Sequence, residues 1–388
     1  MLHENINNKN IILIDSTLRD GEQAPGVSFS REEKFEIAMM LSDAGIDEIE
    51  AGIPAMGDDE VHFLKKLSSS GCRSRIIAWC RAHMTDLELA AESGVSDVHI
   101  SFPVSDRHLK IQGKSRAWAI DNLSIIAGKA SEMFDRVYVG AQDATRCDFG
   151  FLQTFVEEAE KSRVSRVRIA DTVGSSSPSE IYEMIRSLVS VLSSTIIEFH
   201  GHNDFGMATA NAVSAIEAGA AAVSATVCGI GERAGNTPLE EIALWLALKK
   251  PGSTIMKTEA LKKICEKVSE ASGIPIPVNK AIVGEKAFVH ESGIHVHGQI
   301  IDFLAYQAFN PELVGSSESF IIGKHSGRAS IKKVLESMGI NVTDLEAVRI
   351  LKSVRKHFEA RIKNTLSEKD LISLVENCSI NVNRRPAS

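Results

Sequence analysis

Short apolar runs alternate along the chain with longer stretches in which apolar residues recur every three or four positions. Apolar runs bounded by glycine and polar residues predict buried strands, and the longer stretches predict amphipathic helices. The runs predict strands near residues 11–14, 48–53, 74–79, 97–102, 136–141, 166–170, 195–199 and 222–228. Each strand is followed by a helical pattern, so the sequence predicts an α/β fold of the (β/α)₈ TIM-barrel type. An open doubly wound sheet is the alternative, but eight consecutive units favour closure.

Capping-box patterns, in which Ser or Thr precedes Glu by three positions, predict where several of these helices begin. The first of these helices should follow such a box and end at Gly45, since glycine commonly stops a helix. In the last, Pro238 would occupy the first helical position, and the barrel would end near Pro251. The paired residues are Ser30 with Glu33, Thr85 with Glu88, Ser177 with Glu180, and Thr237 with Glu240.

The chain beyond the predicted barrel has a different character. Residues 273–278 contain two prolines and predict a stiff extended connector, which is followed to about residue 327 by an irregular, histidine-rich segment. The remainder predicts a small, mostly helical region, with helices ending near residue 338 and spanning about 344–363 and 367–377, each packed on one face. We therefore expect a barrel domain at 1–272, a linker or subdomain at 273–327, and a helical subdomain at 328–388.

Composition narrows the classes of protein. The 388 residues are 44% hydrophobic and 24% charged, which is ordinary for a globular protein, and the formal net charge of −8 argues against nucleic acid or an anionic membrane as partner. No signal-peptide core and no run long enough to span a bilayer is present, so we expect a cytoplasmic protein. The six cysteines are dispersed, which suits reduced thiols rather than a disulfide framework.

The loop at residues 15–23, Asp-Ser-Thr-Leu-Arg-Asp-Gly-Glu-Gln, follows the first predicted strand, at the edge where barrels carry their chemistry. It holds a guanidinium, carboxylates, an amide and hydroxyls, which suits binding of an anion and a hard cation. An ordinary turn with a solvated ion pair is the alternative.

His200 and His202 end the seventh predicted strand and, being two positions apart, should point the same way. They make half of a metal site, whereas two loop histidines without a ligand would be the plainer interpretation. Asp20 should lie close by around a closed barrel, and two imidazoles plus a carboxylate suit a divalent metal acting as a Lewis acid. Asn236, in the glycine-rich segment after the eighth strand, could add a neutral oxygen.

Two further residues suit a reaction at a carbonyl group. Arg19 would sit beside the metal, where a permanently charged donor stabilises an oxygen that becomes negative. Thr172, at the end of the sixth strand, offers a hydroxyl to a substrate carboxylate, although local backbone capping is the alternative for it.

Three segments together resemble the α-isopropylmalate and homocitrate synthase family of metal-dependent barrels: residues 18–23, 200–204 and 229–236. The resemblance covers essentially the whole chain. Residues 52–57 and 78–81 are similar to the matching segments of homocitrate synthases associated with nitrogenase cofactor assembly, which would connect the chain with nitrogen fixation.

The resemblance implies that the acetyl methyl of acetyl-CoA, the co-substrate, adds to the ketone of a 2-oxo acid, after which hydrolysis releases CoA. A divalent metal, Mg²⁺, Mn²⁺ or Zn²⁺, would be bound by Asp20, His200 and His202, with Asn236 nearby or in its shell. The implied partners are small molecules and a second copy of the chain, as a homodimer with exchanged C-terminal segments.

The resemblance also implies roles for residues around the metal. Arg19 would polarise the ketone oxygen, and Gln23 and Thr172 would hold the carboxylate end of the 2-oxo acid. The base assembly would include His295 and Tyr306 from the segment after the barrel, reaching the partner's active site. Without the resemblance, the histidines of this segment would be interpreted as surface residues.

Gln142 departs from the family pattern, because many members carry a glutamate at this position before the aspartate. Glutamine can hydrogen-bond His295 but cannot ionise, so it would not raise the basicity of that imidazole. Asp143 and Glu291 are alternative carboxylates. Leucine-regulated members also carry an extra C-terminal domain for which this sequence leaves no room, so we expect no feedback inhibition of that kind.

The leading expectation is homocitrate synthase, acting on 2-oxoglutarate; oxaloacetate, 2-oxoisovalerate, pyruvate or a phosphonate analogue are alternatives within the same reaction. One methylene is typically worth only about 1–3 kcal/mol in a pocket, so sequence does not choose among them. His108, in the segment 101–114, is a candidate for contacts to a distal carboxylate. An acyl-CoA lyase would need a catalytic cysteine in a glycine-rich mobile loop, and none is placed after strand eight in the needed manner. A non-catalytic metal or 2-oxo acid binding protein is the third class.

Overall fold

The structure is a computed structural model that describes residues 10–359 and 366–378. It divides into two compact units, one extending to Ile276 and the other beginning at Pro277, and each is described by itself. The first nine residues of the predicted barrel domain 1–272, the end of the helix predicted at 344–363 and the last ten residues of the predicted helical subdomain 328–388 lie outside the described residues. Within the described residues, no helix has the length and apolar character needed to cross a membrane.

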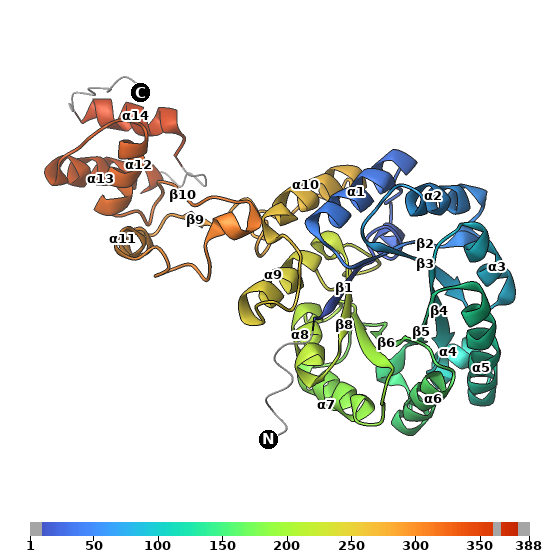
Figure 1. Cartoon of the computed structure of the whole chain (residues 1–388). Helices are drawn as coiled ribbons and strands as arrows, with labels where there is room; N and C mark the ends of the chain where they lie inside the picture. The colour runs from blue at the N-terminus through green and yellow to red at the C-terminus, as the bar shows by residue number, and fades with distance from the viewer. Residues whose placement is uncertain (1–9, 360–365, 379–388) are drawn as a thin grey trace. The chain divides into compact units, whose positions relative to one another are not determined.

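Eight parallel strands close into a barrel in chain order, with the first strand paired to the last (Figure 1). This confirms the predicted (β/α)₈ fold. The strands are β1 (Ile12–Asp15), β2 (Glu48–Gly52), β3 (Arg75–Arg81), β4 (Asp97–Pro103), β5 (Arg136–Gln142), β6 (Arg166–Asp171), β7 (Ile196–Gly201) and β8 (Ala222–Ala225). Residues 226–228, predicted as the end of β8, are not part of it, because Thr226 already pairs with the backbone of Thr237.

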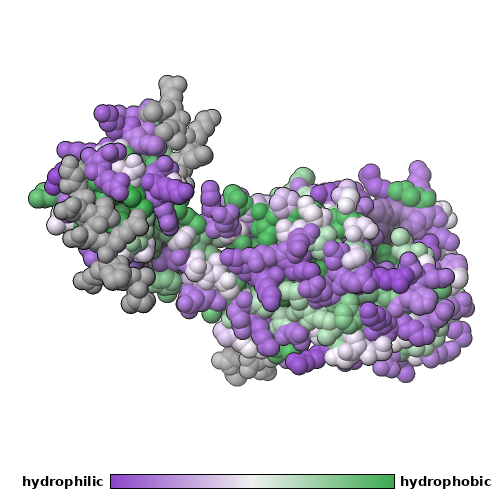
Figure 2. Space-filling view, turned by 90° about the horizontal axis from the view of Figure 1, so that it is seen from above, coloured by the Kyte–Doolittle hydropathy of each residue, from purple (hydrophilic) through white to green (hydrophobic). Residues whose placement is uncertain are grey.

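Helices surround the barrel on its outer side (Figure 1). They are α1 (Arg31–Ala44), α2 (Asp58–Ser68), α3 (Met84–Glu92), α4 (Asp106–Ile111), α5 (Arg116–Met133), α6 (Phe149–Lys161), α7 (Pro178–Val189), α8 (Ala208–Ala218), α9 (Leu239–Lys249) and α10 (Leu261–Ser272). The visible face of this unit is mainly hydrophilic with scattered apolar patches (Figure 2), as expected for helices that bury only one stripe.

Two of the four predicted capping boxes are present, at Ser30 before α1 and at Ser177 before α7. The box predicted at Thr85 is wrong, because α3 begins one residue earlier and His83 accepts the backbone N–H of Thr85. The box predicted at Thr237 is also wrong. The hydroxyl of Thr237 donates to the carbonyl of Gly201 on β7 instead. Helix α9 therefore begins after Pro238, which provides no side-chain cap.

Charged side chains fill part of the barrel interior, although the strands were predicted from apolar runs. Arg166 on β6 lies 2.6 Å from a carboxylate oxygen of Glu48 and 2.7 Å from one of Glu198. Arg168, two positions further along, bonds Glu50 at 2.8 Å and also Glu198. All five side chains are buried, and the buried Arg19, which also binds Glu50, brings the guanidiniums to three against three carboxylates. This balance matters because an unpaired ion in this interior would be strongly unfavourable.

The second unit contains a two-stranded parallel sheet and four helices within the described residues. The elements are β9 (Val289–His290), α11 (Gly293–Ile301), β10 (Ser319–Phe320), α12 (Arg328–Ser337), α13 (Asp344–Glu359) and α14 (Glu368–Asn377). The three predicted tail helices are present as α12, α13 and α14, and α13 buries Ala347, Ile350, Leu351 and Val354 along one face, as predicted. Helix α11 was missed, since its two glycines and two histidines weaken the helical pattern.

Replacing Arg166 by methionine should lower the free energy of unfolding by about 3–5 kcal/mol, because Glu48 and Glu198 would lose a buried counter-ion. Urea unfolding followed by circular dichroism measures this change. The matched surface control is Lys161→Met, whose pair with Glu158 is exposed and should matter by less than about 1 kcal/mol. If Arg166→Met with Glu48→Gln is no more stable than Arg166→Met alone, the ionic explanation fails.

Candidate active site

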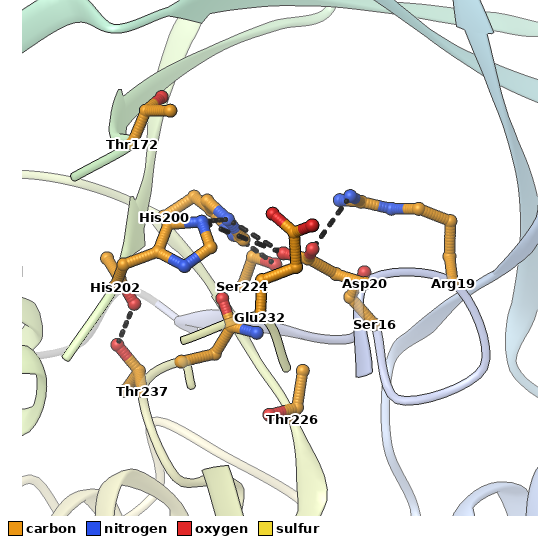
Figure 3. Close-up of polar contacts among 12 residues, drawn as sticks. Ser16, Arg19, Asp20, Thr172, His200, His202, Ser224, Thr226, Glu232 and Thr237 are labelled. Carbon is orange, nitrogen blue, oxygen red and sulfur yellow. Dashed lines mark hydrogen bonds and ion pairs between the residues drawn. The ribbon is translucent and has the colours of Figure 1, made fainter. Parts of the chain in front are cut away.

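Asp20, His200 and His202 converge at the carboxyl ends of the barrel strands. The loop after β1 supplies Asp20, β7 supplies His200, and His202 follows β7 directly. An oxygen of Asp20 lies 3.1 Å from Nε2 of His200 and 4.0 Å from Nε2 of His202, and the two Nε2 atoms are 3.3 Å apart. Figure 3 shows the three side chains pointing toward one another, and all three are buried. The strand spacing therefore brings two imidazoles and a carboxylate to one point.

The local contacts prepare these imidazoles to act as metal ligands. Nδ1 of His200 lies 3.1 Å from the hydroxyl of Ser224 on β8, which orients the ring and directs Nε2 toward Asp20. Burial, followed by the neighbouring His200, lowers the pKa of His202 to about 4. The imidazole of His202 is therefore neutral near pH 7, with a lone pair to donate.

Arg19 is held beside Asp20 by a carboxylate of the barrel interior. Its Nε donates to Glu50 at 2.6 Å, its NH1 lies 3.3 Å from Asp20, and its guanidinium lies 5.7 Å from the ring centre of Trp79. Burial alone would raise the pKa of Asp20, but Arg19 and then the imidazoles outweigh it, so this pKa is lowered. Asp20 is thus ionised next to a fixed positive charge.

The donor set fits a divalent metal. The ligand atoms of Asp20, His200 and His202 all lie within 4.8 Å of one another, and imidazole with carboxylate suits Mn²⁺, Fe²⁺ or Zn²⁺. Asn236 lies beside His202 through a backbone bridge, and its buried Oδ1 has no hydrogen-bond partner among the residues that the structure describes. An unsatisfied amide oxygen at this place is consistent with a further ligand position.

A cavity of about 200 Å³ contains this cluster. Among its lining residues are the predicted Arg19, Gln23, Gln142 and Thr172. The hydroxyl oxygen of Thr172 accepts the backbone N–H of Asp143 at 2.9 Å, which leaves its proton for another acceptor. A larger cavity of about 610 Å³ adjoins it and shares the lining residues Trp79, Ser101 and Gln142. We call these the metal cavity and the outer cavity.

His108 is not among the residues that line either cavity; its Nε2 lies 3.6 Å from the carboxylate of Asp143. That carboxylate also accepts hydrogen bonds from Arg146 at 2.7 Å and from Ser105 at 2.5 Å. Asp143 therefore stabilises the loop that follows β5. Glu291, the other alternative carboxylate, accepts the backbone N–H of His325 in the second unit.

His295 and Tyr306 lie together in the second unit. Their rings stack with centroids 4.2 Å apart, and His290 lies 6.3 Å from His295. Tyr306 remains exposed. The two residues predicted for the base assembly therefore lie side by side in the second unit.

A cysteine does lie in the loop after β8, because the strand ends at Ala225 rather than at Cys228 as predicted. Its Sγ is 3.9 Å from the carbonyl oxygen of Cys265, and Cys228 is not among the residues lining the metal cavity. The thiol that a lyase would require is thus not aimed at the metal ligands. All six cysteines lie within the described residues and are free, as predicted.

Sequence reasoning missed the residues that hold the site in place. Glu50 orients Arg19, and Ser224 orients His200. Glu48 and Glu50, like Arg166 and Arg168, are two positions apart on buried strands. Residues two positions apart on a strand point to the same side, so two acidic residues on one strand and two basic residues on another indicate ion pairs inside the barrel. This pattern in the sequence could have predicted the charged interior.

Comparisons with known proteins agree over nearly the whole chain. The family model described as HMGL-like matches residues 10–268, and one described as homocitrate synthase post-HMGL domain-like matches residues 282–362. The chain is 41% identical over 369 residues to 2-isopropylmalate synthase 2 of Caldanaerobacter subterraneus subsp. tengcongensis, covering 95% of this chain and 96% of that protein. It is 44% identical over 328 residues to homocitrate synthase of Frankia alni, covering 84% and 93%. The crystal structure of Bacillus subtilis HMG-CoA lyase superposes with a TM-score of 0.64 at 21% identity, over 70% of this chain and 96% of that one, which shows the shared fold.

The Asp20→Asn variant should bind Mn²⁺ roughly 100-fold more weakly or worse, since even outer-shell changes cost about 10–100-fold. Isothermal titration calorimetry with the full chain measures the affinity. Asp106→Asn is the control, because that exposed carboxylate pairs with Arg116 outside the candidate site and its loss should leave Mn²⁺ binding unchanged. Equal affinities of Asp20→Asn and the unmodified protein would show that the cluster is not the metal site.

Proposed function

The chain belongs to the HMGL-like family as an acyl-transferring enzyme, and we propose that it condenses acetyl-CoA with 2-oxoglutarate to give homocitrate and free CoA. The observation that carries this proposal is the convergence of Asp20, His200 and His202 beside Arg19 in a small cavity. This arrangement suits an electrophile with adjacent ketone and carboxylate oxygens, such as a 2-oxo acid.

The lining of the metal cavity favours a 2-oxo acid with a polar far end. Apart from Ala170 and Trp79, the residues between β3 and β6 that line it are polar or glycine: His99, Ser101, Gly140, Gln142, Arg168 and Thr172. An isopropyl group would meet hydrogen-bonding groups there and leave them unpaired, whereas a carboxylate would accept from them. This supports a dicarboxylic acid over 2-oxoisovalerate.

A metal at Asp20, His200 and His202 would supply Lewis-acid polarisation of the substrate oxygens. Arg19, fixed by Glu50, would donate to the ketone oxygen, which gains negative charge when the acetyl carbon bonds to the ketone carbon. Thr172 would donate its free hydroxyl proton to the acid's carboxylate, which holds the ketone in place. The carboxylate end would also contact Gln23 at the cavity edge.

The acetyl methyl is a weak acid, so a positioned base must remove its proton before the new carbon–carbon bond forms. We assign this step to His295, with Tyr306 stacked on it, supplied by a partner chain in a homodimer. The outer cavity meets the metal cavity at Trp79, Ser101 and Gln142, which gives a second substrate a way to the reacting carbon. Water then hydrolyses the thioester and releases CoA.

A second candidate substrate is 2-oxoisovalerate, because relatives named 2-isopropylmalate synthase are as similar to this chain as those named homocitrate synthase. Oxaloacetate is the third, since it shares the second carboxylate of 2-oxoglutarate and differs by one methylene. The polar lining favours the first candidate over the second, and the comparison of acids below distinguishes 2-oxoglutarate from oxaloacetate.

The proposal is tested by measuring thiol release from acetyl-CoA with Mg²⁺, Mn²⁺ or Zn²⁺ and each of 2-oxoglutarate, oxaloacetate, 2-oxoisovalerate and pyruvate. We expect 2-oxoglutarate to give the highest kcat/KM, with homocitrate identified by mass spectrometry and activity lost after chelation. Thiol release that needs no 2-oxo acid, or no release with any of the four, would contradict the reaction. A preference for 2-oxoisovalerate would contradict the substrate assignment alone.

Gln142→Glu should lower kcat/KM for 2-oxoglutarate by about tenfold or more, because a new carboxylate on the cavity wall would face a dianionic substrate. Gln112→Glu is the matched control, since Gln112 lines only the outer cavity and is exposed. Steady-state kinetics on both variants measure the effect. If Gln142→Glu matches or exceeds the unmodified enzyme, glutamine has no specific part in this site.

A further inference from the structure

A second cluster of metal-binding side chains lies apart from the residues that line the metal cavity. It consists of Cys228 in the loop after β8, Glu240 in the first turn of α9, and Cys265 in α10. The two sulfur atoms and a carboxylate oxygen all lie within 4.8 Å of one another. Glu240 and Cys265 are buried, and Cys228 is half-buried, which leaves the cluster an approach from solvent.

The contacts within the cluster link the three elements. Glu240 accepts the backbone N–H of Cys228 at 2.9 Å, and the thiol of Cys265 lies 3.8 Å from the same oxygen. The thiol of Cys228 in turn approaches the carbonyl oxygen of Cys265 at 3.9 Å. The sulfur contacts are long for hydrogen bonds, so the thiols are gathered around the carboxylate without being tightly bound to it.

The backbone of Cys228 adds an independent observation. Its φ of 58° lies in the left-handed region, where residues with a side chain are uncommon and glycine or asparagine is favoured. The following residue is glycine, also at positive φ. A strained position that carries a thiol, directed at a second thiol and a carboxylate, indicates a use for that thiol.

We propose that Cys228, Glu240 and Cys265 form a second metal site, which binds a thiophilic divalent cation of the Zn²⁺ class. Zn²⁺ with sulfur and oxygen ligands at about 2.0–2.3 Å requires donor atoms about 3.5 Å apart, so donor atoms that lie within 4.8 Å of one another need to approach by no more than about 1.3 Å. Three protein ligands leave one position for water on the side of Cys228. The ligand classes keep the two sites distinct, since thiolates select Zn²⁺ and bind Mg²⁺ or Mn²⁺ poorly.

Cysteine binds a metal ion as the thiolate, so binding of a cation at this cluster would release the protons of the Cys228 and Cys265 thiols.

Binding there would reach the candidate active site through the loop after β8. The carbonyl of Gly229, next to Cys228, accepts the backbone N–H of Asn236 at 2.9 Å. Fixing Cys228 to α9 and α10 would thus hold the segment that carries Asn236 beside His202. The second site would act on the position of that loop and contact no substrate.

The test uses Co²⁺ as a spectroscopic probe for Zn²⁺, because cobalt bound by thiolate gives a sulfur-to-cobalt charge-transfer band that imidazole and carboxylate ligands do not give. The reduced full-length protein carries Asp20→Asn, which weakens the first site. We expect the band to saturate near one equivalent of Co²⁺ and to disappear on adding Zn²⁺. Cys228→Ser and Cys265→Ser in this background should each weaken or remove it, whereas Cys72→Ser, at a half-buried cysteine outside the cluster, should not.

Glu240→Gln gives a second readout that does not depend on losing a thiol, because the visible bands of Co²⁺ should shift while the charge-transfer band remains. The proposal is overturned if no charge-transfer band forms in protein whose thiols are shown to be reduced, or if the band survives the loss of both Cys228 and Cys265. It is also overturned if mass spectrometry shows that these cysteines form a disulfide under the reducing conditions used, since the pair would then be a redox couple. These outcomes do not depend on which 2-oxo acid the enzyme uses.

Discussion

The carboxylate of Glu50, buried inside the barrel, is the group on which the candidate active site depends. It binds Arg168 from β6, Arg19 from the loop after β1, and the hydroxyl of Ser16. Burial alone would keep this carboxyl protonated, but Arg168 and then Arg19 hold its pKa well below the usual range. The charge of Glu50 therefore exists only because two guanidiniums face it, and Arg19 is fixed in return. Because the buried Glu50 needs positive partners, it also fixes the position of Arg19 in the candidate active site.

The same constraint explains how the three candidate metal ligands are held in place. Arg19 lies between Glu50 and Asp20, so Asp20 is ionised without a metal, and Ser224 orients the ring of His200. These contacts come from β1, β2 and β8, which are neighbours around the closed barrel. Closure of the sheet is therefore as necessary to the site as the ligands, because an open sheet would separate β1 from β8.

Much of this arrangement could be predicted from the sequence, for reasons that are local. The two-residue spacing of His200 and His202 fixes their common direction on a strand, and the eightfold alternation places the ends of β1 and β7 on one rim. What could not be predicted depends on long-range competition. Thr237 matched a capping box, yet its hydroxyl found a carbonyl on β7, and β8 ended early because Thr226 paired with Thr237. The partner of Arg19 could not be chosen from sequence either, since several acidic residues lie in strands.

The shape of the metal cavity on its β4 and β5 side follows from one absent side chain. A Cβ at Gly140 would lie 2.5 Å from Nε2 of His99, so the cavity wall there is formed by an imidazole and bare backbone. Burial, followed by Arg168, lowers the pKa of His99 well below its usual value, so this imidazole is neutral.

Arg168, which also lines this cavity, is bound to Glu50 and Glu198. The far end of a substrate would thus meet neutral donors and a guanidinium already balanced by carboxylates. Arg19 lies beside the candidate ligands Asp20, His200 and His202 in the same cavity, which places a guanidinium where the reacting end of a 2-oxo acid would bind.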